Sequence, residues 1–158
     1  MIMQIRMAEE QDVPSIRVLL ERNYDEVMSK HHSKRIIDTF KSRTNDESIS
    51  NGLKWKKVYV VMDDGGEVIA TGAFANFGSV EKPKYSVSNL FVMPEKQSNG
   101  IGRMLFEKLY QEAKANHAGS FHVPSSRNAI GFYEKMGFIV DEEQPEKDDE
   151  VTWMTMVV

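Results

Sequence analysis

The first half of the chain combines one strand-like and two helix-like patterns of apolar residues. Apolar and polar residues alternate over residues 3–7, which predicts a half-buried strand. Apolar residues then recur at helical spacing from Ile16 to Leu20, and we expect Asp12 to cap this helix. Ile36 to Phe40 indicates a second short helix, whereas the polar segment 44–52 is expected to form a loop.

The second half has clearer boundaries between its elements. Residues 58–62 are rich in β-branched side chains, DDGG (63–66) is typical of a tight hairpin turn, and 67–77 is the expected return strand. The next strand covers Tyr85 to Val92, and Pro94 ends it because proline cannot continue the hydrogen-bond ladder. A helix is then expected to start at Ile101 and to end at Gly119, followed by a strand at 121–123. The last expected elements are a helix at 128–136 with Gly137 at its end, and closing strands at 138–140 and 151–158.

This order of elements indicates the fold class. Hairpin neighbours in the middle of the chain are followed by a run in which strands and helices alternate. Such an order implies one mixed sheet with helices on its faces, so the expected class is α/β. The length of 158 residues fits a single domain that spans residues 1–158.

Composition narrows the function classes without naming a reaction. The chain has no cysteine, which excludes disulfides, thiol catalysis and cysteine-ligated metal sites. Its net charge of −4 argues against nucleic-acid binding, which depends on neutralising phosphates. No apolar run approaches the roughly 20 residues that span a bilayer, and the N-terminal residues lack a signal-peptide pattern. We therefore expect a cytoplasmic protein that binds neither nucleic acid nor membrane.

One loop carries a pattern of chemical interest. Residues 99–102 (NGIG) lie between the strand 85–92 and the helix that follows. Glycines there let backbone N–H groups converge on an anion, and the helix N-terminus adds unpaired N–H groups, which together suit a diphosphate. A plain turn before a helix is the alternative. A dinucleotide-binding motif does not fit, because Leu105 stands where its third glycine would fall.

Two motifs resemble signatures of one enzyme family. The stretch NLFVMPEKQSNGIGRMLFEKL resembles the acetyl-CoA-binding motif of the GNAT family of N-acetyltransferases. Gln97, Gly100 and Gly102 satisfy its signature of Gln or Arg, two residues, Gly, any residue, then Gly or Ala. Further on, AIGFYEKMGF (129–138) is similar to the second marker helix of the family. The resemblance covers nearly the whole chain and is most specific over residues 87–140.

The resemblance implies a GNAT fold and a cofactor site. The fold has a single mixed, mostly antiparallel sheet with helices on both faces, and its central strands, here 87–92 and 119–123, splay apart. In relatives, the pantetheine arm of acetyl-CoA pairs with the first of these strands and the glycine loop cradles the diphosphate. Arg103 either adds charge near the phosphates or is an exposed helix arginine, and Asn128 either contacts the cofactor or caps its own helix. The cofactor-binding residues implied are Leu90, Phe91, Val92, Gln97, Ser98, Asn99, Gly100, Ile101, Gly102, Arg103, Ser126 and Asn128.

Tyr133 is the catalytic residue that the resemblance implies. An amine would attack the thioester carbonyl directly, and the tyrosine hydroxyl would donate a proton to the leaving thiolate. A half-buried aromatic side chain on an amphipathic helix is the structural alternative. The sequence shows no evident general base, since strand 85–92 holds no carboxylate and no histidine. His122 and Glu81 are weaker candidates than a water relay to bulk solvent, which residues 88–89 could order.

The acceptor is the part of the reaction that the sequence determines least. Segment 24–55 is expected to shape acceptor specificity, as the corresponding segment does in relatives. The acidic segment 141–150 either attracts a cationic amine or is a solvated loop. The basic segment 54–57 (KWKK) indicates an exposed loop or a strand edge blunted by lysine. His31 and His32 do not predict a metal site, because adjacent helical residues point about 100° apart.

The sequence therefore predicts an acetyl-CoA-dependent N-acetyltransferase, without a metal, that acts on a primary amine of a small molecule. A protein or peptide N-acetyltransferase is the alternative among enzymes, and a CoA-binding sensor or interaction module without turnover is the alternative outside them. Neither the acceptor nor the length of the acyl chain follows from the sequence. The apolar closing strand 151–158 is a candidate edge for a homodimer.

Overall fold

A mixed sheet forms the centre of the molecule. The computed structural model describes residues 3–145 and 150–158. Over these residues the sheet has the strand order β1-β2-β3-β4-β5-β7-β6, with antiparallel neighbours except for the parallel pair β4 and β5. The strands are β1 (Gln4–Met7), β2 (Lys57–Met62), β3 (Val68–Asn76), β4 (Tyr85–Val92), β5 (Ser120–Ser125), β6 (Ile139–Val140) and β7 (Thr152–Val157). The predicted mixed, mostly antiparallel sheet is confirmed.

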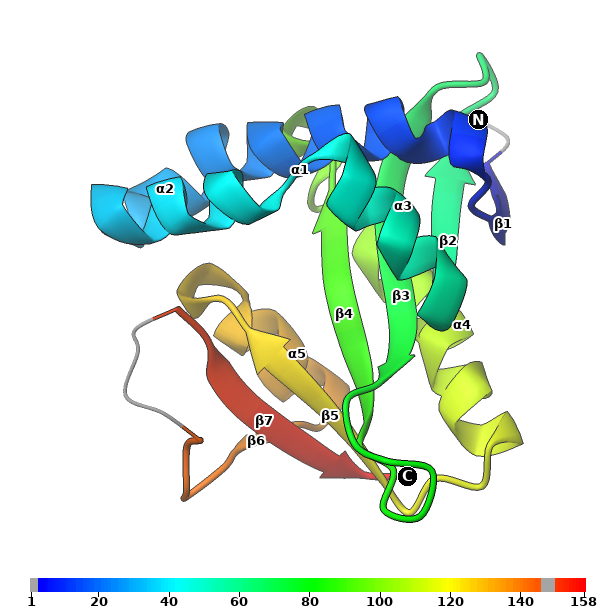
Figure 1. The fold of residues 1–158 in the computed structure, drawn as a ribbon, viewed down its shortest axis with the longest axis vertical. Coiled ribbons are helices and arrows are strands. Elements are labelled where there is room, and N and C mark those ends of the chain that lie inside the picture. The colour runs from blue at the N-terminus through cyan, green and yellow to red at the C-terminus, as the bar shows by residue number, and fades with distance from the viewer. Residues whose placement is uncertain (1–2, 146–149) are drawn as a thin grey trace.

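Helices cover both faces of this sheet, as expected. They are α1 (Val13–Glu26), α2 (Lys34–Arg43), α3 (Asp46–Trp55), α4 (Ile101–Ala115) and α5 (Ile130–Met136). Figure 1 shows α1, α2 and α3 on one side of the sheet and α4 behind β3 and β4. Side chains of β2 alternate between the two faces: Val60 packs in the core with α1, whereas Tyr59 and Val61 pack in the core with α4.

The sheet opens between β4 and β5. The two strands are paired at Ser86 and His122 and then diverge, so that β4 and β5 form a V in Figure 1. Asn89 lies in the diverging part of β4, where the register with β3 shifts and its φ is 49°. An extra residue of this kind bends a strand away from regular pairing. The predicted splaying of the central strands is confirmed.

The prediction of a loop over 44–52 is wrong, because most of this segment belongs to α3. Asn45 begins the helix with a capping box: its side-chain oxygen accepts from the backbone N–H of Ser48 at 2.9 Å, and Ser48 Oγ accepts from the N–H of Asn45 at 3.1 Å. Ile49 and Leu53, one turn apart, are the helix's partly buried apolar residues. Such a narrow apolar stripe is easily taken for loop composition.

Two predicted helix boundaries are also corrected. Asp12 makes no side-chain cap for α1, because its carboxylate accepts from Arg6 at 2.7 and 2.8 Å and from the backbone N–H of Glu9 at 2.7 Å. The helix α4 ends at Ala115, and His117 rather than Gly119 takes the left-handed conformation that follows, with φ of 57°. Gly137 does end α5, with φ of 109°.

Candidate active site

A cavity of about 450 Å³ lies where β4, the loop before α4 and α5 meet. We call it the glycine-loop cavity. All the residues predicted to bind the cofactor line it except Asn99, whose side-chain amide instead donates to the carbonyl of Lys96 at 3.2 Å. Asn128 makes no cap hydrogen bond for α5, so the capping alternative does not hold. The sequence motifs therefore converge on one volume.

Backbone conformation makes the glycine loop suited to an anion. Ser98 and Gly100 have φ of 70° and 79°, and Gly100 directly precedes the first turn of α4. The first N–H groups of a helix have no partner within the helix, and the macrodipole makes this end positive. The N–H groups of residues 101–103 are therefore presented at the wall of the cavity.

Two amide side chains fasten this loop to β4. Asn23 of α1, which is 2% exposed, donates to the carbonyls of Leu19 and Val92, each at 3.0 Å. Gln97 donates to Asn23 Oδ1 and to the same Val92 carbonyl, each at 3.2 Å. The Gln97 side chain thus holds the loop in place. Sequence reasoning missed Asn23, although a polar residue beside Leu20 on an apolar helix face is a signal for a buried role.

The charged lining of the glycine-loop cavity has one sign. Lys96, Arg103 and Lys135 line it, and no carboxylate does so among the described residues. This charge suits a ligand with several phosphate groups. Arg103 lines the cavity and is also exposed, so both interpretations of this residue stay open, and Lys96 and Lys135 were not among the residues predicted to bind the cofactor.

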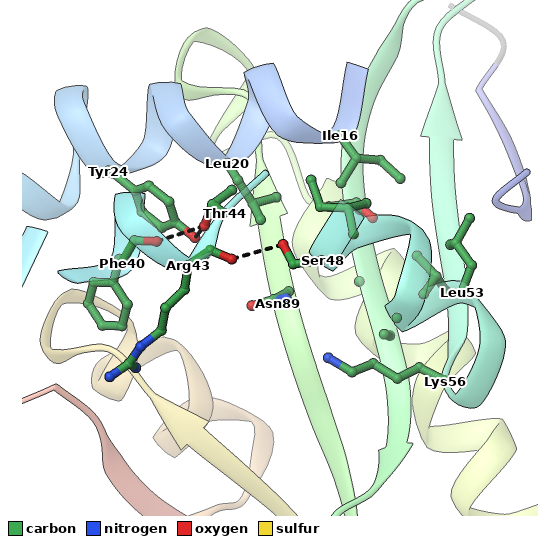
Figure 2. Close-up of a pocket in the computed structure, with 16 residues that line it drawn as sticks. Ile16, Leu20, Tyr24, Phe40, Arg43, Thr44, Ser48, Leu53, Lys56 and Asn89 are labelled. Atoms are coloured by element: carbon green, nitrogen blue, oxygen red, sulfur yellow. Dashed lines mark hydrogen bonds between the residues drawn. The ribbon is translucent and has the colours of Figure 1, made fainter. Parts of the chain in front are cut away.

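Two further cavities lie on the other side of β4. The strand-gap cavity, of about 450 Å³, lies between β4 and β5 and extends towards α1 and α2. The helix cavity, of about 340 Å³, lies between the sheet and α1, α2 and α3. Figure 2 shows the residues that line the helix cavity, with Asn89 of β4 near its centre. These two cavities share the residues Tyr24, Phe40, Arg43, Lys56 and Asn89.

Tyr133 lies on the wall that joins the glycine-loop and strand-gap cavities. Its side chain is 5% exposed and packs edge to face against Phe132 and Phe138. Burial raises the pKa of the Tyr133 hydroxyl well above its usual value of 10.0, so the group carries its proton at neutral pH. The hydroxyl therefore carries a proton that it can donate, although burial makes it a weaker acid than a free tyrosine.

Comparison with known proteins identifies the family. A family model described as the acetyltransferase (GNAT) domain matches residues 25–158. The chain belongs to the GNAT family of acetyltransferases. No curated protein sequence matches it.

Solved GNAT structures share the fold of the whole chain at low sequence identity. The PaiA N-acetyltransferase from Thermoplasma acidophilum, solved with coenzyme A, is 17% identical over 100% of both chains with a TM-score of 0.83. A GNAT protein from Rhodopseudomonas palustris is 16% identical over 100% of this chain and 99% of that chain, with a TM-score of 0.82. An acetyltransferase from Clostridium acetobutylicum, solved with acetyl-CoA, is 20% identical over 93% and 96%, with a TM-score of 0.71.

The titratable candidates for a general base lie away from the cavities of this GNAT chain. His122 lines none of the three, and its Nδ1 is 3.0 Å from Thr155 Oγ1, which itself donates to Asp141 at 2.6 Å. Glu81 is exposed and also lines none of them. Ser88 and Asn89 do line the strand-gap cavity. Of the three routes that the sequence offers for removing the amine proton, a water relay ordered by these two residues is therefore the one that lies at a cavity.

His32 has a structural role. It is 8% exposed, and its Nε2 accepts from the backbone N–H of Arg127 at 3.2 Å, in the turn that leads from β5 to α5. Burial, together with the charges of Arg127 and His31, lowers the pKa of His32 below 6.5. Among the described residues, no group of three His, Asp or Glu side chains could hold a metal ion. No helix in the described part of the chain is long and apolar enough to cross a membrane.

The acidic segment 141–150 contacts the helix α2 through Glu150. Glu150 pairs with Arg43 at 2.9 and 3.2 Å, which links α2 to the residues before β7. Asp148 and Asp149 lie outside the described residues. Attraction of a cationic amine and a solvated loop therefore both remain open interpretations of this segment.

Proposed function

We propose that this GNAT chain transfers acetyl from acetyl-CoA to a primary amine of a small molecule, by direct attack in a ternary complex. The observation that carries the proposal is the position of Tyr133 on the wall shared by two cavities. The donor occupies the glycine-loop cavity and the acceptor occupies the strand-gap and helix cavities. The thioester then lies at their junction, beside the tyrosine hydroxyl.

Binding of the donor uses backbone groups and cations. The pantetheine arm lies along Leu90 to Val92, in the part of β4 that has no pairing with β5. The diphosphate lies against the N–H groups of residues 98–102, with Lys96, Arg103 and Lys135 supplying positive charge. Coenzyme A in the Thermoplasma acidophilum neighbour and acetyl-CoA in the Clostridium acetobutylicum neighbour support this assignment of the donor.

The proposed chemistry needs one proton donor and one route for a proton to leave. The neutral amine nitrogen attacks the carbonyl carbon, so a C–N bond forms and the C–S bond breaks. The leaving sulfur takes the proton of the Tyr133 hydroxyl. The proton that the amine loses passes through water ordered by Ser88 and Asn89 to solvent, from which Tyr133 is reprotonated.

The size of the acceptor cavities favours a small molecule over a protein. Volumes of about 340 and 450 Å³ are typical of sites for small ligands. The helices α1, α2 and α3 line the helix cavity, and the Arg43–Glu150 pair lies beside the strand-gap cavity. A peptide N-terminus would have to enter between these elements.

The test measures thiol release from acetyl-CoA for the wild type and for Tyr133→Phe. The acceptors are a panel of small amines and one peptide with a free N-terminal amine. The variant removes the proton donor but keeps the ring. We expect kcat to fall by roughly 10²-fold or more, with CoA affinity nearly unchanged. Tight CoA binding without release for any amine would instead indicate a non-catalytic binding module, and preference for the peptide would indicate a protein acetyltransferase.

A further inference from the structure

The cationic side chain of Lys56 lines both the helix cavity and the strand-gap cavity, which together form the proposed acceptor site. It follows the last residue of α3 and precedes β2. Lys54, Trp55 and Lys57 are exposed, whereas Lys56 is partly buried and its Nζ donates to Ser88 Oγ of β4 at 3.0 Å. The prediction of an exposed loop or a lysine-blunted edge over 54–57 is therefore wrong at Lys56, because β2 is an interior strand between β1 and β3.

No carboxylate among the described residues forms an ion pair with Lys56. The ammonium instead lies 4.8 Å from the ring centroid of Trp55 and 5.8 Å from that of Phe77, and aromatic faces favour its charged form. Its neighbour Lys57 pairs with Glu112 at 2.7 Å. Burial lowers the pKa of Lys56 from 10.5, which shows that the charge is held against a cost in solvation.

The described charged residues that line the two acceptor cavities are cations. Of the described residues that line the helix and strand-gap cavities, Arg43 and Lys56 are the charged ones, and no carboxylate is among them. Arg43 already holds Glu150 in a two-bond contact, which leaves Lys56 as the cation without an anionic partner there. In Figure 2 the Lys56 amine and the Arg43 guanidinium lie on either side of Asn89. In a chain with a net charge of −4, the described lining of these two cavities thus holds two cations and no carboxylate.

We propose that Lys56 binds a carboxylate of the acceptor, so that the substrate is a small amino acid rather than a diamine. The inference rests on the proposed acetyl transfer and names the acceptor class for the same site. One available ammonium suits a singly charged carboxylate better than a phosphate, which would need more donors. The carboxylate accepts from Lys56 Nζ beside Ser88, and the amine points along β4 to the thioester.

The spacing along β4 limits the length of this acceptor. Ser88, which holds Lys56, and Leu90, where the donor's arm ends, are two residues apart, at most roughly 7 Å along a strand, since the bulge at Asn89 shortens it. The carboxylate and the amine of the acceptor must bridge a gap of this order. Among the simple amino acids, extended 4-aminobutyrate comes nearest to this length and glycine falls well short of it, whereas long polyamines offer no anion to Lys56 at all.

The test compares matched amines with and without a carboxylate: glycine with methylamine, β-alanine with ethylamine and 4-aminobutyrate with propylamine, together with the diamine putrescine. Thiol release from acetyl-CoA gives kcat and KM for each. For the wild type, kcat/KM is expected to be at least tenfold higher for the best amino acid than for its matched amine. Equal values, or preference for putrescine, would overturn the assignment.

Variants separate an anchoring role from other roles of Lys56. Lys56→Gln is expected to raise KM for amino acids about tenfold with little change in kcat. The kinetics of the simple amines should not change in this variant. Lys56→Arg, which keeps the positive charge, is expected to restore part of the affinity for amino acids. Lys57→Gln, next to it but facing Glu112, is the matched control and should behave as the wild type. A fall in kcat for every amine, with an altered pH profile, would contradict anchoring and indicate that Lys56 takes part in proton transfer.

A binding measurement keeps the inference testable apart from turnover. If no amine releases thiol, the proposed function fails, and titration of 4-aminobutyrate and propylamine into the protein–CoA complex by calorimetry still addresses Lys56. Binding of 4-aminobutyrate that Lys56→Gln abolishes supports the carboxylate site. Absence of glycine, β-alanine and 4-aminobutyrate binding to the wild type overturns it.

Discussion

Lys56 and Lys57 are adjacent in sequence and lie in opposite surroundings. Lys57 is exposed and paired with Glu112, whereas the Lys56 ammonium contacts the hydroxyl of Ser88, which is 5% exposed, and two aromatic rings. Isolating a cation from water without an opposite charge destabilises a protein. The Lys56 ammonium therefore lowers the stability of the ligand-free protein. The proposed acceptor carboxylate explains why the chain keeps it, because this carboxylate would supply the missing opposite charge when the substrate binds.

This contrast gives a prediction on stability. Lys56→Met removes the desolvated charge and loses one hydrogen bond to Ser88, which is worth about 1 kcal/mol. We therefore expect the free energy of unfolding, measured in urea, to stay within about 1 kcal/mol of the wild type or to rise. Loss of activity towards amino acids with retained stability fits a functional lysine. A loss of stability above roughly 3 kcal/mol would show that Lys56 is mainly structural.

At the scale of elements, the loop and first turn of α4 place two glycines in different roles. Gly100 adopts φ of 79°, a conformation that L side chains rarely take. Gly102 lies inside the helix and lines the glycine-loop cavity, with Phe132 and Val92 as its nearest neighbours. The first glycine allows the turn, and the second leaves space at the start of the helix.

Gly102→Ala and Gly102→Val test the second of these roles. The Cβ of Gly102→Ala would lie 3.4 Å from Phe132 and 3.6 Å from Val92, which is ordinary contact, and alanine favours a helix over glycine by about 1 kcal/mol. The fold should therefore be kept, and because the motif admits alanine at this position, the Kd for CoA, measured by calorimetry, should stay close to the wild-type value. The larger side chain of Gly102→Val reaches further into the cavity and should raise the Kd at least tenfold, with Gly131→Val on α5, where an added Cβ meets nothing within 4 Å, as the matched control. Unchanged affinity in Gly102→Val would remove the glycine loop from the donor site.

The elements also show what sequence reasoning can reach. Gly100 before α4 and Gly137 after α5 were predicted correctly because a local motif defines each of them, and the catalytic role of Tyr133 on α5 stays a prediction. The helix α3 was missed because its apolar stripe consists of little more than Ile49 and Leu53. The roles of Asn23 and Lys56 depend on partners 69 and 32 residues away, Val92 and Ser88, and no local pattern records such contacts.

At the scale of the whole molecule, contacts outside the sheet tie its two halves together. Between β4 and β5, the sheet itself is paired at Ser86 and His122. His32, close to the start of α2, accepts from Arg127 beyond β5, and Arg43 pairs with Glu150 before β7. The closing strand β7 was named above as a candidate edge of the sheet. Its outer side pairs with the two-residue strand β6 at Met154 and Thr155, so β6 is the outermost strand there. The contact between the helices and the second half of the sheet therefore contributes to global stability.

This arrangement predicts a dependence of stability on pH. Burial lowers the pKa of His32 below its unfolded value of about 6.5, so the unfolded state binds the proton more strongly. Stability from the neutral ring is complete above pH 6.5 and declines as the pH falls below it. We expect the Tm to drop between pH 7.5 and pH 5.5, and the drop to be smaller in His32→Gln. His31→Gln removes only a smaller contribution to this shift and should reduce the slope less than His32→Gln does, and an identical slope in all three proteins would contradict this role.

The opening between β4 and β5 has a consequence for how the protein avoids self-association. An unpaired strand edge ordinarily offers a template on which another chain can add a strand and begin to aggregate. Here the two unpaired edges face each other across the V of the sheet, so each shields the other from neighbouring molecules. The molecule can therefore keep backbone hydrogen-bonding groups open for its cosubstrate without exposing them to other copies of itself.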